Sequence, residues 1–240
     1  MPRLPLAAYP YRPMIRTLAE TGSTNDDLAA LAREGAAEGL WLRAERQTGG
    51  RGRQGRAWSS PPGNLYASTL VRLRAADPPA PTLALTAAVA LQETVSTYAS
   101  GILIKWPNDL LAGPAKLSGI LLEREGDAVV IGLGVNLAHH PQDLARPATS
   151  LSALTGTAPD PHVFLDHLAE TFARWLARWR GEGLAPIRTA WLAAAHPRGT
   201  ALSTPEGDGL FEGLDESGAL RLRLPGGELR TIHAGDVFLI

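Results

Sequence analysis

The order of the hydrophobic patterns along the chain limits its possible folds more than any other feature. Apolar alternation and short apolar runs predict β-strands at residues 14–20, 40–45, 64–73, 101–106, 118–124 and 128–135. Helical periodicity predicts helices from about residue 25 to 35 and at residues 81–99, 162–180 and 184–195. Because strands and helices do not alternate strictly, the pattern predicts an α+β fold around a mixed sheet.

The pattern changes after Ala195. His196-Pro197 ends the last helical segment, and residues 199–240 contain short strand-like segments separated by turns rich in Gly, Asp and Pro. This predicts a small five-stranded β-barrel, and a unit of this size is not expected to fold independently. We therefore predict a main domain at residues 1–196 and a C-terminal barrel at residues 197–240.

Composition excludes several classes of protein. Among the 240 residues, 23 Lys and Arg stand against 24 Asp and Glu, and this balance argues against a protein that coats nucleic acid. The absence of Cys excludes a disulfide scaffold, a Cys-ligated zinc site and a Cys nucleophile. No apolar run reaches membrane-spanning length, and residues 1–13 lack the regions of a signal peptide. We predict a cytoplasmic protein with no membrane partner.

Lysine and asparagine are rare in this arginine-rich chain, so each remaining one is a candidate for a specific role. Chance survival is the alternative at any single position, but the clustering of both lysines with one asparagine weighs against it. The positions are Lys105, Lys116, Asn25, Asn64, Asn108 and Asn136.

A glycine- and arginine-rich segment, Gly50-Arg51-Gly52-Arg53-Gln54-Gly55-Arg56, follows the strand predicted at residues 40–45. Guanidinium groups and exposed backbone amides in such a loop can close over a phosphate or a carboxylate. The loop is expected to be mobile when empty because glycine loses much conformational freedom on ordering. A solvated basic loop and an RNA-binding Arg/Gly element are the alternatives.

Two further segments place lysine beside a predicted strand. Lys105-Trp106-Pro107-Asn108-Asp109 follows an apolar run, at the kind of strand end where sites are commonly built. Lys116 begins a strand that contains Gly119, and glycine within a strand often marks the close approach of a ligand. A capped turn with Trp106 in the core, and an edge lysine beside a bulge, are the corresponding structural alternatives.

Together with Ser23-Thr24-Asn25, these segments resemble the motifs of the biotin–protein ligase family, in the same order along the chain. The resemblance implies a catalytic domain related to class II aminoacyl-tRNA synthetases and an SH3-like C-terminal domain. It implies that biotin and ATP form biotinyl-5′-adenylate, which is then attacked by a lysine of a biotin carboxyl carrier protein domain of acetyl-CoA carboxylase. Since the motifs begin at residue 23, the resemblance is to the ligase-only form without an N-terminal DNA-binding domain, and no DNA partner is expected.

The resemblance also implies roles for individual residues. Those implied to act in catalysis are Lys116, Asp109 and Arg53. Those implied to bind biotin are Ser23, Thr24, Asn25, Gln47, Arg51, Gly52, Arg53, Lys116, Gly119 and Leu121. Those implied to bind ATP are Arg53, Arg56, Trp58, Lys105, Asn108, Lys116 and Asn136. Mg²⁺ is implied as a cofactor, and Asp109 is either its ligand or a base toward the incoming lysine.

Two alternative functions stay open at this point. A lipoate or octanoate ligase or transferase shares the fold and a single essential lysine, although the arginine loop and the KWPND segment argue against it. A nucleic-acid-binding module is disfavoured by the balanced charge and the single basic segment. The sequence also leaves a homodimer open.

Overall fold

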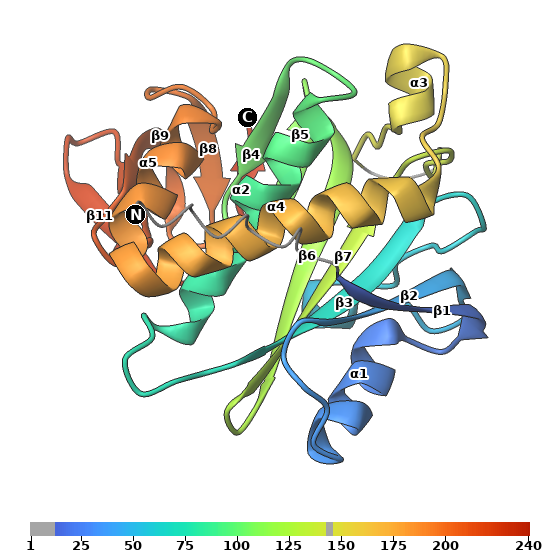
Figure 1. Ribbon diagram of the computed structural model, residues 1–240. Helices are drawn as coiled ribbons and strands as arrows, with labels where there is room; N and C mark the ends of the chain where they lie inside the picture. The colour runs from blue at the N-terminus through green and yellow to red at the C-terminus, as the bar shows by residue number, and fades with distance from the viewer. Residues whose placement is uncertain (1–12, 143–145) are drawn as a thin grey trace, which may run out of the picture.

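The computed structural model describes residues 13–142 and 146–240, which form a seven-stranded sheet flanked by helices and a separate five-stranded sheet (Figure 1). The larger sheet has the order β1-β2-β3-β7-β6-β5-β4. Only β1 and β2 pair in parallel, so the sheet is mixed. Its strands are β1 (Met14–Thr21), β2 (Leu40–Gln47), β3 (Leu65–Arg72), β4 (Ile102–Lys105), β5 (Asp109–Ala112), β6 (Ala115–Glu125) and β7 (Ala128–Val135).

Helices cover both faces of this sheet. The short helix α1 (Thr24–Arg33) begins at Ser23, whose hydroxyl accepts a hydrogen bond from the amide of Asp26, and it packs its Leu28 side on β2, β3 and β7. The opposite face carries α2 (Leu83–Ser96) and α4 (Pro161–Glu182), and α5 (Leu184–Ala193) packs against these two helices and against the C-terminal sheet. Trp41, Phe172 and Trp179 are buried in the core on this side.

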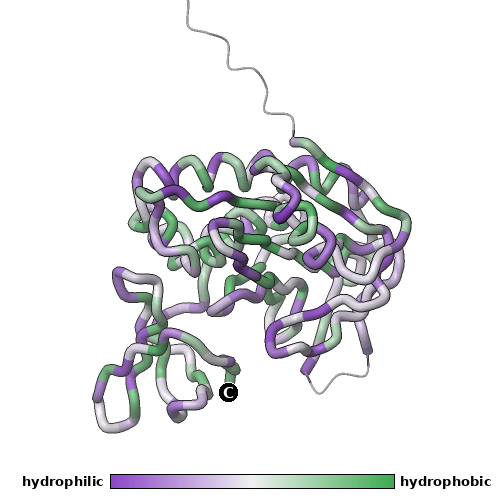
Figure 2. Tube along the Cα trace, turned by 90° about the horizontal axis from the view of Figure 1, so that it is seen from below, coloured by the Kyte–Doolittle hydropathy of each residue, from purple (hydrophilic) through white to green (hydrophobic). Residues whose placement is uncertain are grey.

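The C-terminal sheet is antiparallel and has the order β11-β10-β9-β8-β12. Figure 2 shows it as a lobe beside the main body, with the C-terminus on the side that faces the rest of the protein. The strands are β8 (Ala201–Thr204), β9 (Gly207–Leu214), β10 (Leu220–Arg223), β11 (Leu229–Ile232) and β12 (Phe238–Leu239).

One hydrophobic core runs through both parts of the chain. Trp191 of α5 packs against Phe211 of β9, with ring centroids 6.4 Å apart. The indole nitrogen of Trp106 donates to the carbonyl of Gly218, 3.2 Å away, so this tryptophan is a core residue as well as part of a motif. Because the core is continuous, the division at residues 196 and 197 stays a prediction.

The α+β fold with a mixed sheet and a small C-terminal β-unit is confirmed, as are the predicted strands and helices within a few residues. Among the described α-helices and strands of the main body, β5 and the short helix α3 (Leu151–Thr155) were not predicted. Among the described residues, no helix is long and apolar enough to cross a membrane.

Candidate active site

A cavity of about 650 Å³ lies between the larger sheet, the arginine-rich loop and the C-terminal segment at residues 236–239. Within the described part of the chain, six basic and two acidic side chains line it, so it is suited to anions. The cavity brings together every residue that the sequence predicted for the site, and their individual roles remain predictions. They are Ser23, Thr24, Asn25, Gln47, Arg51, Gly52, Arg53, Arg56, Trp58, Lys105, Asn108, Asp109, Lys116, Gly119, Leu121 and Asn136.

One end of the cavity is lined by a hydrogen-bonded network at the start of α1. The backbone amide of Thr24 donates to Gln47 Oε1 at 2.8 Å, and the Thr24 hydroxyl lies 2.7 Å from the Ser68 hydroxyl. Ser68 in turn donates to Asn25 Oδ1 at 2.6 Å, and Asn25 Nδ2 donates to Glu123 at 2.7 Å. These bonds fix the orientation of amide and hydroxyl groups that line the cavity, as recognition of a polar ring system requires.

Glycines of β6 and β7 allow an aromatic ring to lie flat on the sheet. A Cβ added to Gly134 would lie 2.6 Å from the ring of Trp58, and one added to Gly119 would lie 3.3 Å from it. The Trp58 indole nitrogen is buried and has no hydrogen-bond partner within residues 13–142 and 146–240. Trp58 thus presents both an aromatic face and a free donor at the site.

Both lysines of the chain converge on Asp109. The turn at residues 106–108 joins β4 to β5 and pairs Lys105 with Asp109 across the two strands. Lys105 Nζ lies 3.1 Å from Asp109 Oδ2, and Lys116 Nζ lies 2.6 Å from Asp109 Oδ1. The side chain of Lys116 is 37% exposed and that of Lys105 is only 13% exposed, so Lys116 is the lysine that a ligand can contact directly.

Opposing effects set the charges of this triad. Burial disfavours ionisation of Asp109, but the two neighbouring ammonium groups outweigh it and hold the pKa of the carboxyl below its ordinary value. Burial lowers the pKa of Lys105, and the charge of Asp109 opposes that effect. An ionised carboxylate held between two cations makes Asp109 a poor proton acceptor.

The arginine-rich loop forms a narrow hairpin over the cavity. Arg51 bridges to Ala57, the amide of Trp58 donates to the carbonyl of Gly50, and a 3₁₀ turn (Arg53–Gly55) forms the tip. A Cβ at Gly50 would lie within 2.9 Å of Ser60, Gln47 and Trp58 atoms, so only glycine fits there. Gln54 and Gly55 at the tip both have positive φ angles.

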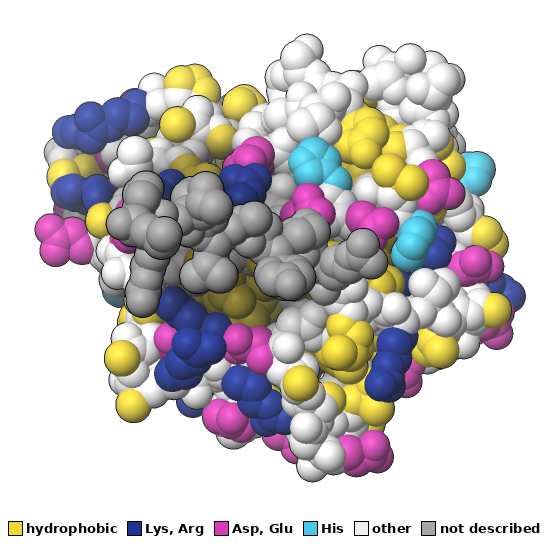
Figure 3. Space-filling model, viewed as in Figure 1, with side chains coloured by type: hydrophobic (Ala, Val, Ile, Leu, Met, Phe, Trp, Pro, Cys, Tyr) yellow, Lys and Arg dark blue, Asp and Glu magenta, His cyan; other side chains and the backbone are white. Residues whose placement is uncertain are grey.

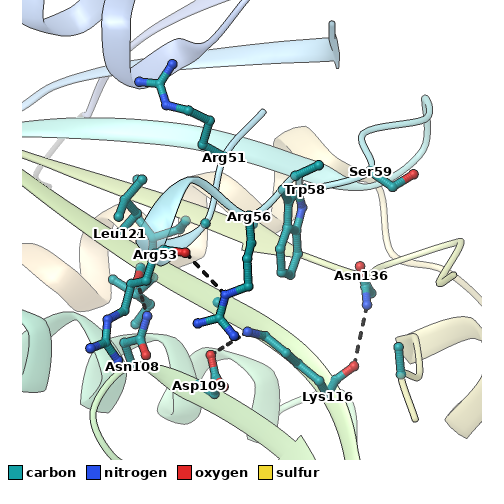
Figure 4. Close-up of a pocket in the computed structure, with 18 of the residues that line it drawn as sticks. Arg51, Arg53, Arg56, Trp58, Ser59, Asn108, Asp109, Lys116, Leu121 and Asn136 are labelled. Atoms are coloured by element: carbon teal, nitrogen blue, oxygen red, sulfur yellow. Dashed lines mark hydrogen bonds and ion pairs between the residues drawn. The ribbon is translucent and has the colours of Figure 1, made fainter. Parts of the chain in front are cut away.

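The arginines of the loop point in two directions (Figure 4). The Arg51 guanidinium points away from the lysines and makes two hydrogen bonds to Asp26, which lower the pKa of that carboxyl. Arg53 and Arg56 point toward the end of the cavity that holds Asp109 and Lys116. Among the loop arginines, these two are therefore the candidates for contact with a phosphate, whereas Arg51 anchors the loop.

The retained asparagines all make defined hydrogen bonds. Asn108 Nδ2 donates to the carbonyl of Ile120 at 2.5 Å, and Asn136 Nδ2 donates to that of Thr149 at 2.9 Å. Asn64 lies outside the cavity lining and binds the backbone at residues 138 and 139 through both ends of its amide. Asn64 is therefore structural, while Asn25, Asn108 and Asn136 shape the cavity.

Sequence reasoning missed three polar residues around the cavity: Ser68, Glu123 and Asp236. Ser68 and Glu123 hold Asn25 in place, and Asp236 forms ion pairs with the loop. Ser68 and Glu123 could have been suspected from their positions in strands that flank the motifs. Nothing in the sequence around Asp236 relates it to a loop 180 positions earlier.

The side chains described in the structure do not form a protein site for a divalent metal ion. No group of three or more His, Asp or Glu side chains in the described residues could hold one. Asp109, the one acidic residue that pairs with the lysines in the described part of the chain, has an ammonium group against each oxygen. The geometry thus favours an ion-pairing role for Asp109 over the predicted role as a Mg²⁺ ligand.

Comparison with known proteins places this geometry in a family. Residues 21–136 match the Biotin/lipoate A/B protein ligase family, and residues 203–240 match the Biotin protein ligase C terminal domain. The Biotin–[acetyl-CoA-carboxylase] ligase of Paracoccus denitrificans is 42% identical over 92% of this chain and 98% of that protein. The chain belongs to the biotin–protein ligase family.

Other members of the biotin–protein ligase family support the assignment. The Bifunctional ligase/repressor BirA of Bacillus subtilis is 34% identical over 90% of this chain but only 71% of its own length. The biotin protein ligase from Aquifex aeolicus, solved in complex with biotin and ATP, superposes with a TM-score of 0.85 at 25% identity over 95% of this chain and 99% of that one. The predicted family and fold class are thus confirmed.

Proposed function

We propose that this chain activates biotin with ATP to form biotinyl-5′-adenylate and then transfers biotin to a lysine of a biotin carboxyl carrier protein domain. The observation that supports this best is the meeting of three features in one cavity. A fixed hydrogen-bonding network lies at one end of the cavity, and the arginine loop covers the cavity. Lys116 forms an ion pair with Asp109 beneath the loop. The names of the relatives agree with this reaction.

In the first step, a carboxylate oxygen of biotin attacks the α-phosphorus of ATP. The bond from that phosphorus to the bridging oxygen breaks, and pyrophosphate leaves. Two anions approach each other in this step, so fixed cations lower the barrier by offsetting their repulsion. Lys116, Arg53 and Arg56 point into the space where these groups would meet.

Asp109 acts in this scheme by holding two lysines in place. Its carboxylate fixes Lys116 Nζ at the surface of the cavity, while Lys105 neutralises the other oxygen. The depressed pKa of Asp109 argues against a base that takes the proton of the incoming lysine. The role we propose for it is therefore electrostatic positioning.

In the second step, the ε-amine of the carrier lysine attacks the carbonyl carbon of the adenylate, and AMP leaves. The mixed anhydride reacts readily with water, so the cavity must stay covered until the carrier arrives. The arginine loop is placed to provide that cover. No side chain of the enzyme needs to form a covalent bond.

The proposal includes Mg²⁺ as the companion of ATP. Mg²⁺ keeps several waters and is commonly held by substrate phosphates with few protein ligands. This suits a cavity in which Asp109 is already paired with two lysines and Asp236 with two arginines. We propose the cytoplasm, where ATP is available, as the compartment.

The deciding experiment is exchange of radiolabelled pyrophosphate into ATP, run with biotin, lipoate, octanoate or no acid. Exchange requires reversible adenylation, so it separates a ligase from a transferase and from a binding module. We expect exchange with biotin that depends on Mg²⁺, and little with the linear acids. Those acids would leave the polar groups of the network unpaired, at a cost of about 1–3 kcal/mol for each group.

Two outcomes would contradict the proposal. Faster exchange with lipoate than with biotin would indicate a lipoate ligase. No exchange with any acid in a folded sample would favour a protein that does not adenylate.

On the face shown in Figure 3, basic and acidic side chains are intermixed, as expected of a protein that does not depend on a broad basic surface.

A further inference from the structure

The last strand and the residues before it form one wall of the cavity. This C-terminal segment, Gly235–Leu239, contains β12, which pairs with β8 of the C-terminal sheet. Asp236 to Leu239 all line the cavity. The C-terminal sheet therefore lies close to the reacting groups as well as against the helices of the main body.

Asp236 forms ion pairs with the two loop arginines that point into the cavity. Arg56 Nη2 lies 3.0 and 2.9 Å from the two carboxylate oxygens of Asp236. Arg53 Nη1 lies 3.6 Å from Asp236 Oδ1, and Arg53 Nη2 donates to the carbonyl of Gly235 at 3.1 Å. The Asp236 side chain is only 18% exposed, so this pairing is screened less than one on the open surface.

These contacts are the connections that hold the tip of the loop. Within the part of the chain that the structure describes, every hydrogen bond and ion pair from residues 53–56 to groups outside the loop goes to Gly235 or Asp236. The base of the loop is held separately, by Arg51 on Asp26 and Glu123. A glycine-rich tip has much conformational freedom to lose, so its closed form needs such partners.

The same segment contacts the lysine pair. Lys105 Nζ donates to the carbonyl of Val237 at 2.9 Å while it pairs with Asp109. The Arg146 guanidinium lies over the ring of Phe238, and its carbon Cζ is 3.3 Å from the ring centroid. Order in the C-terminal segment is therefore linked to both the loop and the charged centre of the site.

We propose that Asp236 is a positioning residue that latches the arginine loop over the adenylate through Arg53 and Arg56. The C-terminal sheet then serves to retain the reactive intermediate until the carrier lysine arrives. This inference rests on the proposed function for what is retained. The contacts between Asp236 and the loop do not depend on any reaction, so their effect on the loop can be measured in the substrate-free protein.

The first test measures the dissociation of preformed biotinyl-adenylate from the wild-type protein and from Asp236→Asn. The variant keeps the size of the side chain and removes its charge. We expect dissociation about 10-fold faster, which corresponds to about 1.4 kcal/mol and lies near the low end of what a hydrogen bond to a charged group contributes. Asp236→Glu should restore part of the retention.

A matched control separates the latch from a general effect on the C-terminal sheet. Asp208 of β9 is exposed and has no ion pair among the described residues, so Asp208→Asn removes the same charge from the same sheet. Its dissociation rate should equal that of the wild type. Equal rates in Asp236→Asn and the wild type would overturn the latch.

A double-mutant cycle tests the partner. If Asp236 acts through the loop arginine, adding Arg56→Gln to Asp236→Asn should raise the dissociation rate less than the product of the two single effects. Independent, multiplicative effects would mean that Asp236 acts by another route and would overturn the proposal.

Hydrogen–deuterium exchange of the substrate-free protein distinguishes failure of the latch from failure of the proposed function. Amides of residues 50–56 should exchange faster in Asp236→Asn than in Asp208→Asn, whether or not the protein adenylates biotin. Unchanged exchange would refute the latch even if biotin is activated. Loss of protection without any adenylation would support the latch and refute the biotin reaction.

Discussion

Lys116 Nζ and Asp109 Oδ1 lie 2.6 Å apart, in a pair that spans neighbouring strands β5 and β6. Asp109 is buried and pairs on its other side with Lys105, whereas Lys116 keeps part of its side chain open to the cavity. The arrangement gives the site one fixed cation that a ligand can reach, supported by a buried carboxylate and a second cation.

Lys116→Arg should reduce adenylate formation at least 100-fold. The ammonium is compact and fits between Asp109 and the ring of Trp58, 5.4 Å from its centroid. A guanidinium keeps the charge but spreads it over a larger planar group, so the two are not interchangeable here. Pyrophosphate exchange with biotin measures the loss, and an unchanged melting temperature serves as the folding control. Near-normal exchange would remove Lys116 from the reaction.

Asp109→Asn should lower adenylation about 10-fold at neutral pH and move the alkaline limb of its pH profile to lower pH. The negative charge of Asp109 raises the pKa of Lys105 against the effect of burial. Without that charge, burial and the nearby Lys116 lower the pKa of Lys105 further, so the lysine loses its proton at a lower pH. An alkaline limb at the same pH in both proteins would show that this coupling is absent.

The same substitution should change how stability depends on acid. The folded-state pKa of Asp109 is depressed, so its ion pairs stabilise the protein above the ordinary carboxyl pKa near 4. That contribution is lost as the pH falls through the folded-state value. The wild type should therefore lose more unfolding free energy than Asp109→Asn between pH 5 and strongly acidic pH, as chemical denaturation would measure. Parallel losses in the two proteins would contradict the ion-pair assignment.

Local periodicity was sufficient to predict most strands and the helices α1, α2, α4 and α5 of this fold, because each presents its apolar residues at a regular spacing. It was insufficient for β5, whose four residues follow a proline turn and are too few to establish a period. The pairing of Lys105 with Asp109 depends on that short strand. The sequence therefore suggested which residues gather at the site but gave no basis for expecting both lysines on one carboxylate.

The sequence was least informative about contacts between distant segments. The biotin-binding role of Arg51 stays a prediction, and nothing local in the sequence indicated that its guanidinium pairs with Asp26 of α1 and Glu123 of β6. Asp236 has no local signal at all, because an aspartate after glycine is ordinary turn chemistry. Such contacts follow from the fold as a whole.

Gly134→Ala should lower the affinity for the adenylate about 10-fold or more. The new Cβ would lie 2.6 Å from the ring of Trp58 and would force that ring off the sheet. Isothermal titration with a non-hydrolysable adenylate analogue measures the effect. Gly181→Ala is the control, since nothing lies within 4 Å of the added methyl group, and its affinity should be unchanged. Equal affinities in both variants would show that Trp58 is not held by this glycine.

Ser68→Ala should raise the KM for biotin about 10-fold with little change in kcat. Ser68 lines no part of the cavity, but its hydroxyl joins Thr24 to Asn25 and fixes which way the Asn25 amide faces. Loss of a buried hydrogen-bonding partner costs about 1–3 kcal/mol, and the cost should appear in ground-state binding because the network lies at the end of the cavity away from Lys116. Thr94→Val in α2 removes another buried hydroxyl, far from the network, and should leave the KM unchanged. A fall in kcat at constant KM would instead place Ser68 with the residues that support the reacting groups.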